Sequence, residues 1–369
     1  MARITRRIAL TMGAAATAVF ITAQAAQAEE VVHVYNWVDY IGETTLDDFT
    51  KATGIKVVYD TYDAAETEEA KMLAGSSGYD VVLHSGSQLP KFIQAGAFQK
   101  IDRSKLPNYD NQDAGILKIV ENWDPGNEYS VVYMWGTTGI TYNLDMVKER
   151  LGDNAPMGTL DILLKPELAA KVVDCGISVL ESPRDVIPMV LSYLGKDPNT
   201  EDPADYDAVV EAFKPVRQYI KTFDASNYLN AIPNKELCVI NNWSGDYATA
   251  STRASEAGVE ISLAYEVPAS GSPAWFDVWA IPKDAKNVEN AYKFLNFMLD
   301  PKVIAEATNY TYYANANAKA AEFVLKEIME DPAIYPNDEI KKRLWTNKSL
   351  SPAAQRALTR AWTKIKTGS

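Results

Sequence analysis

Short apolar runs typical of strands alternate with helical segments near the start of the chain, and this alternation most constrains the fold. Residues 30–37 and 55–59 have strand-like patterns, whereas 66–74 have the spacing of a helix. Residues 79–84 form a short apolar run of the kind buried in a parallel sheet. Strands that alternate with helices favour an α/β sheet, and such sheets bind ligands at the carboxyl ends of their strands.

A second α/β region follows an extended, β-favouring segment at 133–143, which we interpret as a crossing between two lobes. In this region 186–194 are helix-like, 237–241 are strand-like, and 275–282 are extended. Residues 287–299 have the apolar spacing of an amphipathic helix. The sequence therefore predicts two α/β lobes.

The first 28 residues have the three parts of a secretory signal peptide. Three arginines precede an apolar run at 8–21, and Ala26-Gln27-Ala28 supplies the small-x-small pattern of a cleavage site. The run is too short for a stable membrane span. We expect residues 1–28 to be removed on export and the mature protein to begin near Glu29, in the periplasm. Because no cysteine follows the cleavage site, we expect no lipid anchor.

The charge balance points away from nucleic acid. The chain has 49 acidic and 36 basic residues, and its formal net charge is −13. Phosphate backbones need a basic face, so nucleic acid is a poor partner. A cationic ligand would be attracted at long range. The simpler interpretation of the charge is solubility.

Cysteine and histidine are too scarce for most catalytic or metal sites. The two cysteines, Cys175 and Cys238, are expected to form a disulfide in an oxidising compartment. The two histidines, His33 and His84, lie in strand-like runs, where core packing is the commoner role. No metal site or cofactor motif can be assembled, and no catalytic triad is evident, so we do not predict an enzyme.

Aromatic residues recur within a few positions of an aspartate, in loops that follow predicted strands. An aromatic face stabilises an ammonium group, and a carboxylate accepts hydrogen bonds from the same nitrogen. Each tryptophan taken singly has core packing as its simpler role, but three such groups at strand ends favour a site for a cation. The groups are Trp37 with Asp39 and Tyr40, Trp243 with Asp246, and Trp275 with Asp277.

Several of these motifs, in this order, resemble the periplasmic polyamine-binding proteins, and most closely the putrescine-binding branch. The resemblance covers essentially the whole mature chain. It is carried by Tyr35-Asn36-Trp37-Val38-Asp39-Tyr40-Ile41, residues 53–60, Trp243-Ser244-Gly245-Asp246, residues 276–282, residues 312–317 and residues 360–364. Proteins of this family are the substrate-binding components of ABC importers.

The resemblance implies a type II periplasmic binding protein fold, in which two lobes joined by crossing strands close on the ligand. We expect one lobe to contain 29–137 plus about 262–310, and the other 138–261 plus about 311–369. It also implies that a monomer binds spermidine or putrescine and delivers it to an ABC permease in the inner membrane. The family pairs cysteines at positions that match Cys175 and Cys238.

The resemblance further implies roles for individual residues. Aromatic side chains would line the channel for the methylene chain, and carboxylates would bind the ammonium groups. The channel set is Trp37, Trp243, Trp275 and Tyr313. Asp246 and Asp277 would bind one terminal ammonium, and Asp39, Asp185 and Glu181 would bind the other end or an internal amine. Ser85 and Tyr40 would add hydrogen bonds, and Val38 lies among them.

Three positions depart from the putrescine branch and bear on the choice of ligand. Val38 replaces a small hydroxyl residue, Trp275 replaces phenylalanine, and Asp185 is shorter than the usual glutamate. Together they slightly favour spermidine. Alternatives are the same fold with another amine such as agmatine, or with a sugar or a cationic amino acid, a polyamine sensor, and an enzyme with a cysteine nucleophile, which predicts free thiols.

Overall fold

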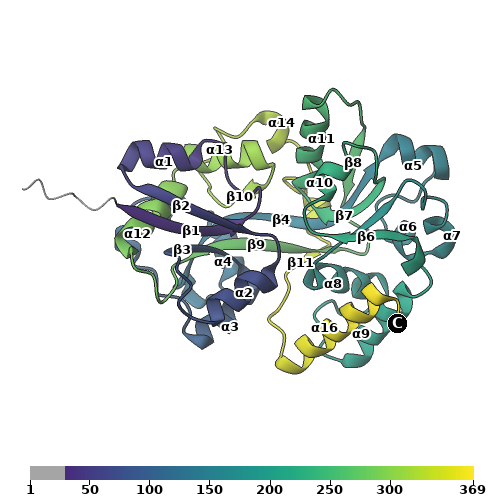
Figure 1. The fold of residues 1–369 in the computed structure, drawn as a ribbon, viewed down its shortest axis with the longest axis horizontal. Helices are drawn as coiled ribbons and strands as arrows, with labels where there is room; N and C mark the ends of the chain where they lie inside the picture. Colours follow the sequence, from purple (N-terminus) through teal and green to yellow (C-terminus); the bar gives the residue numbers. More distant parts are fainter. Residues whose placement is uncertain (1–29) are drawn as a thin grey trace, which may run out of the picture.

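The computed structural model describes residues 30–369, so the predicted signal peptide lies outside the described residues. The chain forms two α/β halves that lie side by side, with strands passing between them (Figure 1). Two long strands run through the middle, β4 (Ser130–Asn143) and β9 (Ser272–Ala280). The predicted extended segments at 133–143 and 275–282 fall within or overlap these strands. The predicted fold class is confirmed.

The first half holds the parallel strands predicted near the start of the chain. The sheet order there is β2 (Lys56–Tyr62), β1 (Val31–Trp37), β3 (Val81–Ser85), β9 and β4. The strands β1, β2 and β3 are parallel, and β9 runs antiparallel to β3. The carboxyl ends of β1 and β3 therefore meet at one edge, where Trp37 and Ser85 lie.

The second half continues the same sheet across β4. The last part of β4 pairs antiparallel with β7 (Val239–Trp243) and β8 (Leu263–Glu266). The strand β5 (Ile177–Leu180) pairs parallel with β7, and β6 (Ile220–Asp224) pairs parallel with β5 at the edge of the sheet. Because β4 pairs with β9 through one part and with β7 through the next, it ties the two halves together.

Helices flank the sheet in both halves (Figure 1). The predicted helices at 66–74 and 287–299 are confirmed as α2 (Ala65–Leu73) and α12 (Val288–Met298). None of the helices within residues 30–369 is long and apolar enough to cross a membrane. The other elements are α1 (Thr45–Thr53), α3 (Leu89–Ala95), α4 (Ala114–Val120), α5 (Leu144–Leu151), α6 (Asp161–Leu164), α7 (Pro166–Ala169), α8 (Pro183–Tyr193), α9 (Pro203–Phe213), α10 (Tyr228–Ala231), α11 (Asp246–Glu256), α13 (Pro301–Thr311), β10 (Ala314–Asn315), α14 (Lys326–Met329), α15 (Asp338–Lys341), β11 (Leu344–Trp345) and α16 (Pro352–Thr367).

Each half has its own hydrophobic core. Trp362 of α16 packs in the core of the second half with β5 and β7. Tyr313 and Ile334, by contrast, pack in the core of the first half with β1 and α12. The boundaries expected from the sequence put residues 311–369 in the second lobe. We therefore propose that the C-terminal part of that lobe begins only near residue 350.

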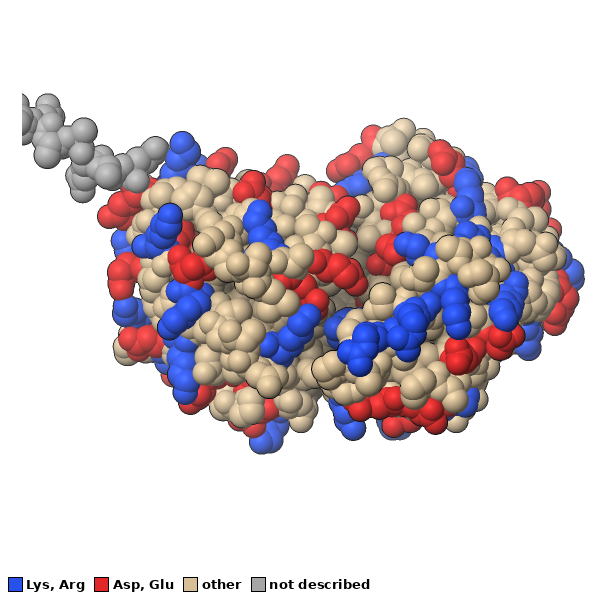
Figure 2. All heavy atoms as spheres, turned by 60° about the horizontal axis from the view of Figure 1, so that its bottom comes forward, with Lys and Arg blue, Asp and Glu red and all other residues tan. Residues whose placement is uncertain are grey.

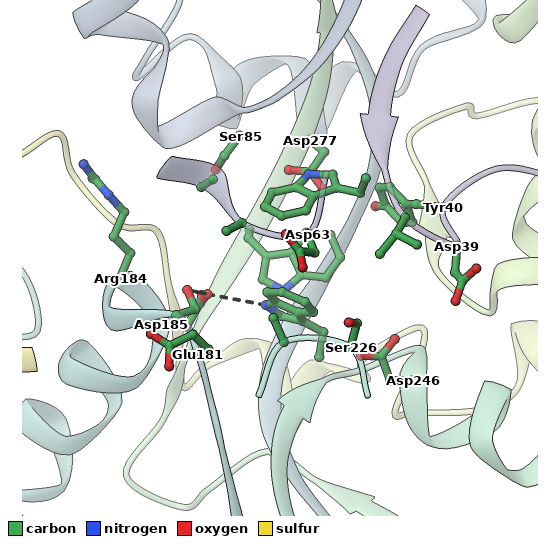
Figure 3. A pocket seen from close by; sticks show the side chains of 18 of the residues that line it. Asp39, Tyr40, Asp63, Ser85, Glu181, Arg184, Asp185, Ser226, Asp246 and Asp277 are labelled. Atoms are coloured by element: carbon green, nitrogen blue, oxygen red, sulfur yellow. Dashed lines mark hydrogen bonds between the residues drawn. The ribbon is translucent and has the colours of Figure 1, made fainter. Parts of the chain in front are cut away.

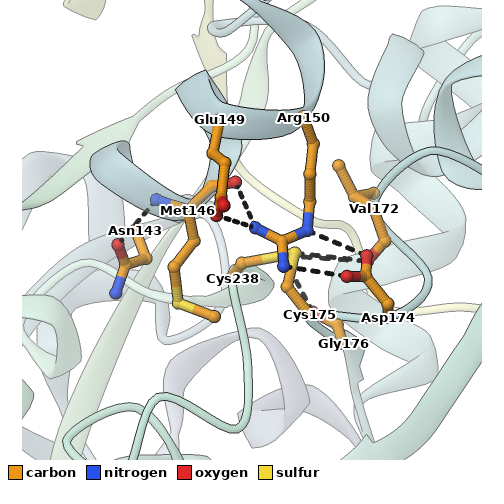
Figure 4. Close-up of polar contacts among 9 residues, drawn as sticks. All are labelled: Asn143, Met146, Glu149, Arg150, Val172, Asp174, Cys175, Gly176 and Cys238. Atoms are coloured by element: carbon orange, nitrogen blue, oxygen red, sulfur yellow. Dashed lines mark hydrogen bonds and ion pairs between the residues drawn. A yellow bond between two sulfur atoms is a disulfide. The ribbon is translucent and has the colours of Figure 1, made fainter.

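The predicted disulfide is present between Cys175 and Cys238, which are 63 residues apart (Figure 4). It joins the segment before β5 to the segment before β7. In the chain-entropy model, closing a loop of this length stabilises the fold by about 4 kcal/mol. Beside it, the Arg150 guanidinium forms two hydrogen bonds of 2.8 Å with the Asp174 carboxylate. Both cysteines of the chain are in this bond, so the hypothesis of a cysteine nucleophile is wrong.

Candidate functional site

A cleft between the two halves brings together every site residue predicted from the sequence. It holds about 1170 Å³ of space free of atoms, part of it open to solvent. Acidic side chains gather in this hollow between the halves (Figure 2). The predicted residues that line it are Trp37, Val38, Asp39, Tyr40, Ser85, Glu181, Asp185, Trp243, Asp246, Trp275, Asp277 and Tyr313.

The ends of strands deliver these side chains, as expected for an α/β sheet. The segment 37–40 leaves the carboxyl end of β1, and Ser85 ends β3. In the second half Trp243 ends β7, and Asp246 begins α11 after a two-residue turn. Asp277 comes from the antiparallel strand β9, where it lies opposite Ser85. Both halves thus contribute carboxylates to one space.

Two glycines let the aromatic side chains of the cleft lie against the backbone. A Cβ on Gly136 of β4 would come within 2.5 Å of the Trp275 ring, and one on Gly245 within 2.9 Å of the Tyr313 ring. The Trp275 and Tyr313 rings are 5.3 Å apart between centroids, edge to face. Across the cleft the Trp37 and Trp243 rings are 6.1 Å apart. These rings form walls suited to a flat or linear apolar segment.

Asp246 is a buried carboxylate without a cation bound to it. It accepts hydrogen bonds from the hydroxyl groups of Tyr228 and Tyr313. Burial raises its pKa to about 6, even though these two hydroxyls lower the pKa in part. A carboxyl group with such a pKa is mostly ionised at neutral pH and is poised to accept a positive charge.

Asp277 is the least compensated of the three buried carboxylates of the cleft. It is only 7% exposed, and burial raises its pKa well above the usual range. The Tyr40 hydroxyl lies near enough to lower this pKa in part, but the two groups do not have the geometry of a hydrogen bond. A buried carboxylate in this state is stabilised strongly by a cation that approaches from the cleft.

Asp185 lies in the first turn of α8, on the opposite side of the cleft from Asp246 (Figure 3). It accepts hydrogen bonds from the hydroxyls of Ser182 and Thr138 and from the Trp243 indole N–H, at 2.5, 3.1 and 3.4 Å. Burial raises its pKa as well. The cleft thus holds carboxylates at both ends, with tryptophan rings between them.

Two other predicted carboxylates already have cationic partners. Asp39 forms an ion pair of 2.8 Å with Arg253 of α11, and Glu181 forms one of 2.7 Å with Lys366 of α16. Glu181 also accepts a hydrogen bond from the Trp362 indole. Both side chains line the cleft, but their charges are largely balanced. The Asp39–Arg253 pair connects the loop after β1 to the second half at the rim of the cleft.

Sequence reasoning missed several residues that line the cleft. Asp63 and Glu66 follow β2, and Ser226 follows β6. These three residues could have been predicted from the sequence, because they follow the carboxyl ends of strands. Arg184 was also missed, because the predicted pattern pairs aromatic residues with aspartates and includes no cation. Within residues 30–369, no group of histidine, cysteine, aspartate and glutamate side chains has the arrangement of a metal site.

Comparisons with known proteins agree with this arrangement. Residues 44–336 match the family model of the bacterial extracellular solute-binding proteins. The chain is 48% identical over 346 residues to a putrescine-binding periplasmic protein of Pseudomonas aeruginosa, with 94% of each chain covered. It is 45% identical over 341 residues to a putrescine-binding periplasmic protein of Escherichia coli, with 92% of each covered. The solved structure of a putative spermidine/putrescine ABC transporter from Listeria monocytogenes superposes with a TM-score of 0.81 and 30% identity, over 91% of this chain and 99% of that one.

Proposed function

The chain belongs to the bacterial extracellular solute-binding proteins, and we propose that it is the periplasmic receptor of a polyamine ABC importer. It binds putrescine or spermidine between its two lobes and, as a monomer, delivers the amine to a permease in the inner membrane. It carries out no reaction itself. The similar proteins of known ligand are named as putrescine-binding, which supports this class of ligand.

One observation supports the proposal most directly: the cleft places buried carboxylates that have no ion-pair partner at both ends of an aromatic channel. Asp246 and Asp277 would bind one terminal ammonium, and Asp185 the other. The tryptophan rings between them would contact the methylene chain, and each ring face that meets an ammonium contributes about 0.5 to 2 kcal/mol. A neutral ligand would leave these carboxylates buried and unpaired, so the cleft selects against it.

Calorimetric titration of the ligand-stripped mature protein tests this proposal. We expect micromolar or tighter binding of putrescine or spermidine and no response to butane-1,4-diol, which has the length of putrescine without its charges. Agmatine in the same series tests the alternative amine. Binding of the diol as tightly as the diamine, or no binding of any of the three amines, would contradict the proposal.

Because Asp39 is already in an ion pair, we expect removal of its charge to have only a small effect on the affinity for putrescine. Asp39 is 51% exposed and already paired with Arg253, and exposed pairs of this kind contribute about 1 kcal/mol or less. We therefore expect Asp39→Asn to weaken putrescine binding by no more than about fivefold in the same calorimetric assay. A loss above about 50-fold would mean that Asp39 leaves Arg253 and binds the ligand directly.

A further inference from the structure

Arg184 is the only lysine or arginine among the described residues that line the cleft. It lies in the first turn of α8, beside Asp185, and its side chain is 20% exposed. In Figure 3 it lies at the same end of the cleft as Asp185 and Glu181, and Asp246 lies at the other end. A fixed positive charge in a cleft built for cations requires an explanation.

Contacts from both halves hold this guanidinium in place. Its Nη2 donates a hydrogen bond of 2.6 Å to Gln355 of α16, in the second half. The same nitrogen lies 3.8 Å from Glu69 of α2, in the first half. Burial lowers the pKa of Arg184, while Glu69, Glu66 and Asp185 favour its charged form. An arginine keeps its charge under these conditions.

Without Arg184, this end of the cleft would lose the cation nearest to its carboxylates. Glu66 and Asp185 line the cleft, and Glu69, 3.8 Å from the guanidinium, also pairs with Lys91 at 2.8 Å. Such a cluster would accept an ammonium group beyond the one bound at Asp185. The Arg184 guanidinium instead supplies a positive charge at this end from within the protein. An ammonium brought next to it would meet a like charge in a partly buried setting, where repulsion is strong.

We propose that Arg184 sets the length and charge of the ligand: it takes the place that a third ammonium would need, so the cleft accepts a diamine and rejects a triamine. This inference rests on the proposed function and deepens it. The substitutions at Val38, Asp185 and Trp275 slightly favour spermidine. We expect the charge repulsion from Arg184 to outweigh them, so that putrescine is the preferred ligand.

Titration of three variants with putrescine and spermidine tests the proposal. We expect the wild-type protein to bind putrescine at least tenfold more tightly than spermidine. Arg184→Gln should reduce this ratio at least tenfold, mainly through tighter spermidine binding. Arg184→Lys, which keeps the charge, should retain the ratio. Arg360→Gln is the matched control, since Arg360 is exposed on α16 and does not line the cleft.

A second measurement needs no variant and so does not depend on the folding of Arg184→Gln. N-butylputrescine has the length of spermidine, with a methyl group in place of the third amine. The wild-type protein should bind it at least tenfold more tightly than spermidine if the charge of Arg184 is decisive. Equal affinity for the two, an unchanged ratio in Arg184→Gln, or a wild-type preference for spermidine would overturn the inference. If the wild-type protein binds no amine at all, the proposed function itself is wrong.

Discussion

Asp277→Asn is expected to weaken putrescine binding by about 100-fold or more. Removal of one partner from a buried, hydrogen-bonded charge pair costs about 2 to 5 kcal/mol, because the other charge is then left without compensation. Asp277 is buried and has no cation beside it, so the ligand ammonium is the group that would balance its charge. Asn has nearly the same shape, and the change therefore tests charge alone. Calorimetric titration at neutral pH measures the loss.

Two controls separate this effect from misfolding and from long-range attraction. Asp47→Asn changes the net charge equally but lies exposed on α1, and we expect it to alter affinity less than twofold. The ligand-free Asp277→Asn protein should also be more stable than the wild type at pH 8. The reason is that burial makes the ionised Asp277 costly in the folded state. A loss of affinity below threefold would remove Asp277 from the site.

The sequence predicted the cleft residues well because their positions follow from a general rule of sheet geometry. Trp37, Ser85 and Trp243 end strands, and parallel strands in one sheet bring such ends together. The limits of single strands were harder to predict. The strand-like pattern at 55–59 stops early, yet β2 continues to Tyr62, because pairing with β1 extends to Trp37 opposite Tyr62.

The electrostatic state of the site could not be predicted from the sequence. Asp39 and Glu181 have partners 214 and 185 residues away, so nothing near them in the chain indicates that their charges are balanced. The same holds for Tyr228 and Tyr313, whose hydroxyls both reach Asp246. Such partners meet only in the folded protein: Asp39 and Arg253 come from different halves, whereas Glu181 and Lys366 come from the same half. Sequence motifs thus predicted which residues line the cleft but not which carboxylates are left for a ligand.

The raised pKa values of Asp246 and Asp277 predict that affinity for putrescine increases with pH. An alkyl ammonium has a pKa of about 10 and stays charged, so protons and ligand compete for the carboxylates alone. With its pKa at about 6, Asp246 by itself should make binding about tenfold tighter at pH 8 than at pH 5. The pKa of Asp277 is raised by burial too, so Asp277 adds to this difference.

The stability of the ligand-free protein should change in the opposite direction. A carboxyl group with a raised pKa in the folded state stabilises the fold below its unfolded pKa of about 4 and loses this contribution as the pH rises through the folded value. Unfolding in urea from pH 5 to pH 8 measures this, and calorimetry in buffers of different ionisation enthalpy counts the protons released. We expect Asp277→Asn to reduce this release of protons. An affinity for putrescine that is constant from pH 5 to pH 8 would mean that these carboxylates do not bind the ammonium groups. If they did, protons would compete with the ligand at pH 5 and weaken its binding.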